Sequence, residues 1–203
     1  MASALLVHKM TEKTDDNIYW ITRREQYECL MSARRMDIID LLANTGARSV
    51  REIARLMGVK PSSLYHHIDL LLGVDLIEVS GTRVVNRRQE KLYQAPGSTL
   101  KYGLSFDDPL AFTLYSRIGD VQARQSARDL RRGLNTDAVV AHGPTKNTWV
   151  FRLVGSPDAN TMAKINHHIE AIAELFWSSA GKDNPIVIMS AIMAPLPRSE
   201  DSK

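Results

Sequence analysis

Residues 49–72 read SVREIARLMGVKPSSLYHHIDLLL, which is the pattern of two short helices joined by a tight turn. Ser49 followed three residues later by Glu52 is a capping box, which satisfies the free N–H groups at the start of a helix. Gly58 is placed to end this helix. Pro61 suits the first position of the next helix, because its missing N–H is not needed there. The stretch therefore predicts two crossed helices around a short turn.

The apolar and polar residues of this stretch fall on opposite faces of the predicted helices. The positions expected to join the two helices are Ile53, Ala54, Leu56, Val59, Leu64, Ile68 and Leu71. The positions left on the outward face of the second helix are Ser62, Ser63, Tyr65 and His66. Such a helix-turn-helix can place hydroxyl and imidazole groups against base edges in the major groove of DNA, with Lys60 and the start of the helix near a phosphate.

The flanking sequence extends this arrangement in both directions. Upstream, apolar residues at three- and four-residue spacing predict a first helix over residues 25–43, which Gly46 ends. Downstream, residues 76–80 and 91–95 have strand composition and enclose a long polar tip. Four basic residues against one acidic residue give this hairpin a local charge of +3, which can reach phosphates or a minor groove; they are Arg83, Arg87, Arg88 and Lys91 against Glu90.

The order of three helices and a two-stranded wing, over about residues 24–100, resembles the winged helix-turn-helix of ArsR-type bacterial transcription regulators. The stretches that carry the resemblance are RRMDIIDLL (34–42), VREIARLMGV (50–59), LYHHIDLL (64–71) and KLY (91–93). The sequence departs from this family at Asp69, where such regulators often carry a basic residue. Its single cysteine, Cys29, also excludes the cysteine pair of a thiolate metal sensor.

The resemblance implies a homodimer that binds specific double-stranded DNA. The recognition helix, residues 61–72, is expected in the major groove, and the basic wing, residues 81–91, on the backbone or in the minor groove. The expected DNA-binding residues are Lys60, Ser62, Ser63, Tyr65, His66, Arg83, Arg87 and Arg88. The alternative is a winged-helix protein-interaction module, whose basic wing contacts an acidic protein without specific DNA binding.

The second half of the chain predicts a small α-β-β-α-β domain. Its elements are a long helix ending near Leu134, strands around 138–141 and 148–154, a helix after Ser156-Pro157, and a final strand over 185–193. The expected fold class is therefore α+β. The expected domains are an N-terminal arm (1–22), a winged helix-turn-helix (23–100) and a C-terminal α/β domain (101–203) for dimerisation and for sensing an effector.

Four aromatic residues of this C-terminal part have two interpretations. Trp149, Phe151, Phe176 and Trp177 either line a pocket for a small-molecule effector of unknown identity or form ordinary core. The adjacent pairs His66-His67 and His167-His168 point about 100° apart on a helix, and no third ligand is suitably spaced. We therefore expect no metal and no cofactor.

The composition is consistent with a regulator and excludes several other classes. The chain has 203 residues, of which 44% are hydrophobic and 24% charged, and its net charge of +3 permits a nucleic-acid partner. One cysteine fits a reducing cytoplasm, and no apolar run approaches the roughly 20 residues of a membrane span. The sequence contains no GxGxxG, P-loop or GxSxG motif. We therefore expect a cytoplasmic protein that has no membrane partner and is not an enzyme.

Overall fold

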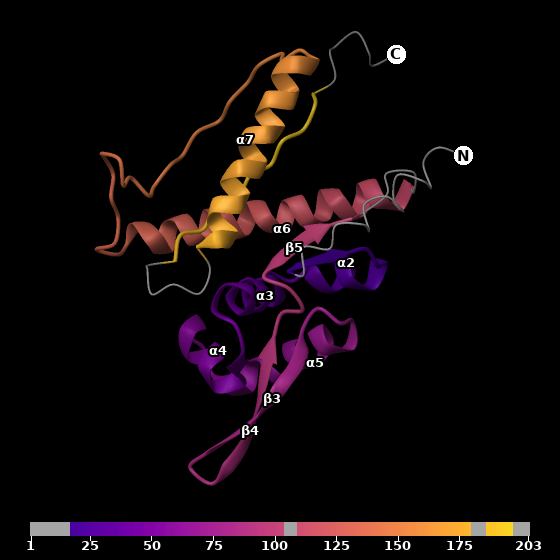
Figure 1. Ribbon diagram of the computed structural model, residues 1–203, viewed down its shortest axis with the longest axis vertical. Coiled ribbons are helices and arrows are strands. Elements are labelled where there is room, and N and C mark those ends of the chain that lie inside the picture. Colours follow the sequence, from indigo (N-terminus) through magenta and orange to yellow (C-terminus); the bar gives the residue numbers. More distant parts are fainter. Residues whose placement is uncertain (1–16, 104–108, 180–185, 197–203) are drawn as a thin grey trace.

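Four helices and a β-hairpin follow one another in the first half of the chain (Figure 1). The computed structural model describes residues 17–103, 109–179 and 186–196. After a first strand, the elements are α2 (Arg24–Leu30), α3 (Ala33–Thr45), β2 (Arg48–Ser49), α4 (Val50–Met57), the 3-10 turn η1 (Pro61–Ser63), α5 (Tyr65–Gly73), β3 (Glu78–Val85) and β4 (Arg88–Gln94). This order confirms the predicted winged helix-turn-helix and the α+β class.

The single helix predicted over residues 25–43 is in fact two helices, α2 and α3. The N–H of Met31 donates to the carbonyl of Glu28 at 3.3 Å and ends α2, and Ser32 has an extended backbone before α3 begins. The apolar residues keep a three- and four-residue spacing across this break. Periodicity alone therefore does not reveal it, because each helix buries its own stripe in the same core.

The hydrophobic core lies where α2, α3, α4 and α5 meet. Its largest fully buried apolar side chains from these helices, and from Leu64 directly before α5, are Tyr27, Ile38, Ile39, Leu42, Ile53, Leu64, Ile68 and Leu71. Leu56, which the sequence places in the core, is 47% exposed, because Ile53 and Ala54 occupy the buried face of the short helix α4. The remaining residues of the predicted seam are buried or packed against the core. The two helices of the turn are thus held in a fixed orientation.

Part of the predicted N-terminal arm is a strand. β1 (Ile18–Ile21) pairs in parallel with β5 (Thr99–Tyr102), with Ile18 opposite Thr99. Ile21 is buried, and its carbonyl accepts a hydrogen bond from the hydroxyl of Tyr27 at 2.8 Å. Residues 1–16 of the arm lie outside the described residues. No period in the sequence predicts this strand, because four residues are too few to show one.

The wing, formed by β3 and β4, is joined at its base to the start of α4 through a second sheet, with strand order β2-β4-β3. In this sheet Ser49 pairs with Leu92, so the residue that caps α4 also belongs to the strand beside the wing. The direct connection means that the hairpin and the helix-turn-helix share a fixed base.

The long helix α6 (Pro109–Leu134) packs on the N-terminal unit instead of beginning a separate domain. Its buried apolar residues are Ala111, Leu114, Ile118 and Val121. Farther along α6, Gln125 donates hydrogen bonds to the carbonyl of Ala33 and to Asp37 of α3, and Arg128 pairs with Asp37 at 2.7 Å. The expected boundary after residue 100 therefore does not separate two cores, because α6 contributes to the core of the winged helix.

The predicted strands of the C-terminal part are not formed within the described residues. α7 (Ala159–Ser178) is present, but residues 138–158 and 186–196 contain neither helix nor strand. A strand needs a hydrogen-bonded neighbour. The Asn147 N–H donates to the Val140 carbonyl at 3.0 Å, but residues 148–154 and 186–196 have no backbone hydrogen bond to a neighbour within the described residues. These two segments run along opposite sides of α7 (Figure 1). The α-β-β-α-β order is therefore corrected to two helices with extended connections. None of the helices described here combines the length and apolar composition that crossing a membrane requires.

We predict that Leu114→Ala lowers the free energy of unfolding by about 2–5 kcal/mol, because the lost side chain leaves a cavity between α6 and the core. The matched control is Leu134→Ala at the exposed end of the same helix, which should change the free energy by less than about 0.5 kcal/mol. Urea unfolding of the full chain measures both effects. Equal losses in the two variants would contradict the packing of α6 on the N-terminal core.

Candidate nucleic-acid interface

The turn between α4 and α5 is fixed by local hydrogen bonds. At the start of α4, the Ser49 N–H donates to the Glu52 carboxylate at 2.9 Å, and the Glu52 N–H donates to the Ser49 hydroxyl at 3.4 Å. At its end, Gly58 adopts a φ of 66°, a left-handed conformation that glycine takes at low cost. The Val59 N–H then donates to the Ala54 carbonyl at 2.9 Å. The capping box and the helix stop are those predicted from the sequence.

The predicted helix 61–72 begins with the 3-10 turn η1, and the α-helix itself starts at Tyr65. In η1 the hydroxyl of Ser63 donates to the carbonyl of Lys60 at 2.7 Å, so its hydrogen is already engaged. Ser62 and Lys60 are exposed. The start of this segment therefore offers the Ser62 hydroxyl and the Lys60 ammonium group to a ligand.

The outward face of α5 is exposed where the helical period predicts it. Tyr65 is 52% exposed, and His66 and Asp69 are also exposed, while Ile68 between them is buried in the core. The neighbouring His67 is half-buried; burial and the nearby positive charge of Arg35 lower its pKa. His66, not His67, therefore presents its ring to solvent.

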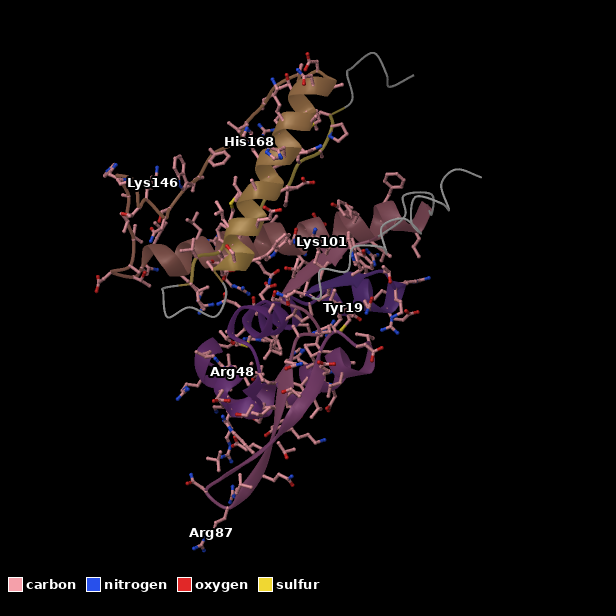
Figure 2. All side chains as sticks on the ribbon, viewed as in Figure 1. Tyr19, Arg48, Arg87, Lys101, Lys146 and His168 are labelled. Atoms are coloured by element: carbon pink, nitrogen blue, oxygen red, sulfur yellow. The ribbon has the colours of Figure 1, made fainter. Side chains whose placement is uncertain are left out.

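The wing has a tight two-residue turn in place of the long polar tip predicted from the sequence. β3 and β4 pair up to Val85 opposite Arg88, and the turn residues Asn86 and Arg87 have φ of 50° and 61°. Both angles lie in the left-handed region that two-residue hairpin turns require. Asn is common in such a turn, whereas arginine there is strained relative to glycine. Arg87 stands at the extreme end of the wing, directed away from the body of the protein (Figure 2).

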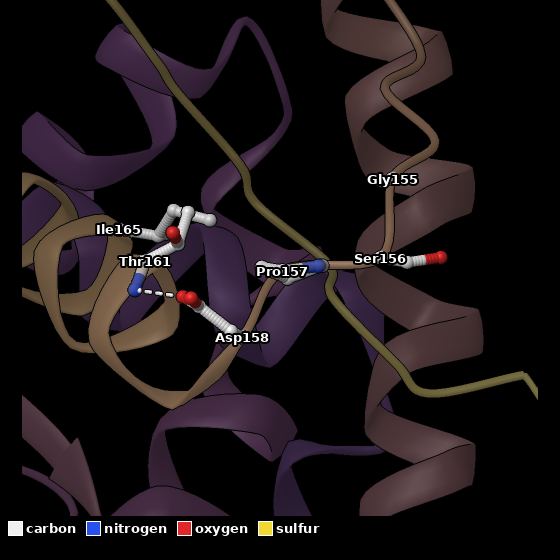
Figure 3. A pocket seen from close by; sticks show the side chains of 6 residues that line it. All are labelled: Gly155, Ser156, Pro157, Asp158, Thr161 and Ile165. Carbon is white, nitrogen blue, oxygen red and sulfur yellow. Dashed lines mark hydrogen bonds between the residues drawn. The ribbon is translucent and has the colours of Figure 1, made fainter.

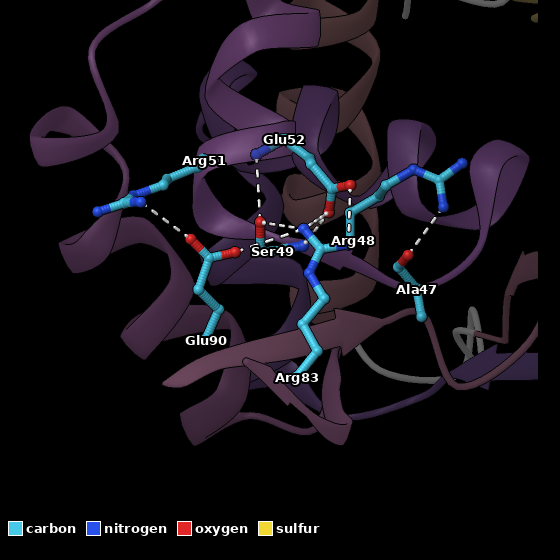
Figure 4. A network of polar contacts seen from close by, with 7 residues as sticks. All are labelled: Ala47, Arg48, Ser49, Arg51, Glu52, Arg83 and Glu90. Atoms are coloured by element: carbon cyan, nitrogen blue, oxygen red, sulfur yellow. Dashed lines mark hydrogen bonds and ion pairs between the residues drawn. The ribbon is translucent and has the colours of Figure 1, made fainter. Parts of the chain in front are cut away.

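The basic residues of the wing divide into two groups. Arg87, Arg88 and Lys91 are exposed and, within the part of the chain that the structure describes, form no ion pair. Arg83, in contrast, is held at the base of the wing. Its guanidinium lies 2.9 Å from Glu52 and 3.3 Å from Glu90, and it also donates to the Ser49 hydroxyl (Figure 4).

This ion network joins the wing to the first turn of α4. Arg51 pairs with the second oxygen of Glu90 at 3.2 Å, so that two arginines and two carboxylates alternate. Partial burial acts to raise the pKa of Glu52, but the Ser49 N–H and Arg83 outweigh it and hold this pKa below its ordinary value. The sequence predicts Arg83 as a phosphate contact, and the structure gives it carboxylate partners instead. A hollow of about 210 Å³ lies beside the network.

The four aromatic residues predicted as an effector site do not meet in one cavity. Trp149 and Phe151 make an edge-to-face contact at 6.3 Å, with the Lys146 ammonium over the Trp149 ring, whereas Trp177 lies against Lys101 of β5. Phe176 is on α7 and partly exposed. An effector at these residues stays a prediction.

A hollow of about 480 Å³ lies at the start of α7, and none of the four aromatic residues lines it (Figure 3). Its lining residues are Gly155, Ser156, Pro157, Asp158, Thr161 and Ile165. The Asp158 carboxylate already accepts a hydrogen bond from the Thr161 N–H at 2.7 Å and so caps the helix. In the described part of the chain, no group of three or more His, Cys, Asp or Glu side chains is arranged to hold a metal ion.

Comparison with known proteins finds a family match within the N-terminal unit. Residues 30–80 match the helix-turn-helix domain family. Among curated proteins, no sequence matches the chain.

Three solved structures are similar to the chain at low sequence identity. The first is the homodimeric winged helix-turn-helix DNA-binding domain of Mb0332 from Mycobacterium bovis, described as a possible ArsR-family regulator (18% identity, TM-score 0.30, 66% of this chain and 96% of that chain). The second is a C30AH42A mutant of ZitR from Lactococcus lactis in apo form (11% identity, TM-score 0.28, 87% of this chain and 98% of that chain). The third is RV1404 from Mycobacterium tuberculosis (19% identity, TM-score 0.25, 85% of this chain and 87% of that chain). None of these likenesses is close enough to transfer a function.

The network around Arg83 predicts a dependence of stability on pH. Because the pKa of Glu52 is lowered in the folded state, its ionised form stabilises the fold above its unfolded pKa, and this stabilisation is lost as the pH falls through the folded value. Arg83→Gln removes the ion pair. The unfolding free energy of this variant should therefore fall less than that of the wild type between about pH 6 and about pH 3.

Urea unfolding across this range measures the difference, and a carbon NMR titration of the Glu52 carboxyl assigns it. Arg87→Gln is the control, because Arg87 forms no ion pair with the described residues and should keep the wild-type pH dependence. Identical curves for the wild type and Arg83→Gln would show that the network does not contribute to stability.

Proposed function

We propose that this chain, whose residues 30–80 belong to the helix-turn-helix domain family, is a homodimeric transcription regulator that binds double-stranded DNA. The observation that carries the proposal is the exposed polar face of α5 beside a wing tip whose arginines have no carboxylate partner among the described residues. DNA as the partner places the regulator in the cytoplasm, and the proposal includes no catalytic activity.

In the proposed complex, α5 lies in the major groove. Tyr65 and His66 are exposed on its outward face and can hydrogen-bond base edges, which gives sequence specificity. Lys60 and Ser62 stand at the start of the segment, where they can hold a phosphate and fix the register of the helix on the duplex. Asp69 follows on the same face and repels phosphate, so the phosphate contacts belong to the first turn and not to the whole helix.

The wing supplies the second contact through Arg87 and Arg88. The left-handed backbone of Arg87 supports this role, because a strained arginine persists where its charge is needed and glycine would fit the turn better. Arg83 is proposed as a positioning residue: by binding Glu52 and Glu90 it sets the angle between the wing and α4.

A dimer is proposed because one winged helix reads only half of a symmetric site. Two recognition helices about 34 Å apart can read two half-sites one helical turn of DNA apart.

The deciding experiment is fluorescence anisotropy of the full chain against duplexes tiling the DNA upstream of its own coding sequence, at two salt concentrations and with unrelated duplex as competitor. Binding that resists the competitor supports the proposal. Absent binding at moderate salt would favour the protein-interaction module.

We predict that Arg87→Gly has opposite effects on stability and on DNA binding. Glycine relieves the left-handed strain of the turn and should raise the free energy of unfolding by about 1 kcal/mol. Loss of the guanidinium from both protomers should weaken binding to all duplexes and reduce the slope of log affinity against log salt by about 1.8, which is about 0.9 for each lost phosphate contact. Thermal unfolding and salt-dependent anisotropy measure the two effects. An unchanged salt slope would refute the wing contact.

His66→Ala should act on specificity instead. Loss of a base contact should weaken binding to the operator by about 5- to 150-fold for each half-site read, with binding to unrelated duplex and the salt slope unchanged. His168→Ala, on the exposed face of α7, is the control for a general effect of removing a histidine. A uniform loss on both operator and unrelated DNA would show that His66 contacts the backbone.

A further inference from the structure

The described residues after Gln125 form no core of their own. The structure describes residues 126–134 at the end of α6, all of α7 and the extended connections, and none of these residues is buried. Two extended segments are the most apolar: residues 148–154 read TWVFRLV and residues 186–193 read IVIMSAIM. Their eleven large apolar side chains, five and six respectively, are between 43% and 83% exposed. Such surface is normally covered in a folded protein.

Both segments have the length, composition and backbone of β-strands without a partner. Arg152 is the only charged residue in the two together, and nearly continuous apolar runs of this kind are typical of strands covered on both faces. Within the described part of the chain, no backbone hydrogen bond joins either segment to a neighbour. Each therefore carries a row of free N–H and C=O groups beside exposed apolar side chains, which is the surface that adds to another strand.

The chain itself does not bring the two segments together. Both run toward the first turn of α7, but on opposite sides of this helix (Figure 1). The helix between them also leaves Ile169, Ile172 and Phe176 more than a third exposed. One chain thus contains two strand-like segments and the helix that would cover them, but the described residues provide neither segment with a neighbouring strand.

We propose that a second copy of this chain supplies these neighbours, so that segments 148–154 and 186–193 of two copies form one shared β-sheet covered by both α7 helices. A two-fold axis pairs an edge strand with its own copy in antiparallel orientation, which closes the open edges. This inference rests on the proposed function, because it assigns the surface that joins the two winged helices.

The area and the charge of the two segments fit this occupant. If each large apolar side chain covers roughly 60–120 Å², the eleven present about 700–1,300 Å², which includes the ~800 Å² per partner of a standard protein interface. A nearly uncharged surface offers nothing to phosphates, so DNA is not the ligand here. The same surface is far from the wing tip in the fold (Figure 1), so a dimer formed through it leaves Arg87 and Arg88 free.

The test compares two matched valine variants of the full chain. Val150 in the first segment is 79% exposed and Val84 in the wing is 74% exposed, so exposure alone does not distinguish them. We expect Val150→Lys to raise the dimer dissociation constant at least about 100-fold, because a symmetric interface loses two buried valines and gains two charges. Val84→Lys should leave it unchanged. Ile188→Lys tests the second segment in the same way, and sedimentation equilibrium measures all three.

Hydrogen exchange of the wild type provides a measurement that needs no variant. The amides of residues 149–154 and 187–192 should be protected, and their protection should increase with protein concentration. A monomeric wild type, or a dimer that survives both Val150→Lys and Ile188→Lys, would overturn the shared sheet. Protection that persists in a sample shown to be monomeric would also overturn it, because the sheet would then form within one chain.

The same samples separate this inference from the proposed function. A dimer with concentration-dependent protection that does not bind DNA would overturn the proposed function and support the shared sheet. A monomer that binds a single half-site would support DNA binding and overturn the shared sheet. A last measurement repeats the hydrogen exchange with vesicles of anionic lipid. Protection of the two segments that appears only when vesicles are added would show that a membrane covers them, and not a second copy of the chain.

Discussion

The guanidinium of Arg83 is the contact on which the geometry of the candidate interface depends. It lies between Glu52, in the first turn of α4, and Glu90, which faces Arg83 from the neighbouring strand β4. Glu52 also caps α4 through the N–H of Ser49, so one carboxylate both begins the helix and holds the wing. A charge-assisted contact of this kind has defined directions, unlike apolar packing. The position of the wing tip relative to α5 therefore follows from how α4 begins.

The sequence is most informative where structure is decided by neighbouring residues. The capping box, the glycine at the end of α4 and the proline before α5 are local signals, and the structure confirms the turn that they predict. The strand Ile18–Ile21 depends on a distant partner, β5, and the break between α2 and α3 lies within one continuous apolar pattern. A periodic pattern records which face is buried, but it does not record where a helix is interrupted when both pieces bury the same face.

The candidate site shows the same division. Helical period alone places Tyr65 and His66 on the outward face, where the structure finds them exposed. The partners of Arg83 could not be predicted, because they follow from the register of the hairpin. Arg83 faces Glu90 only when the turn consists of the two residues Asn86 and Arg87. Because arginine rarely adopts a left-handed backbone, a tight turn is not expected at these residues. Strand composition in the C-terminal part was visible, but composition does not say which chain supplies the neighbouring strand.

The absence of buried residues after Gln125, within the described ranges, also has a consequence for the protein as it is made. If the residues after Gln125 complete a core only with a second molecule, mass action stabilises the assembled protein. Its melting temperature therefore rises with protein concentration. At low expression the newly synthesised chain exposes two apolar edges to every other protein in the cell, where aggregation competes with assembly. The abundance of the chain then sets how much of it is assembled, and a small change in synthesis changes the assembled fraction more than proportionally.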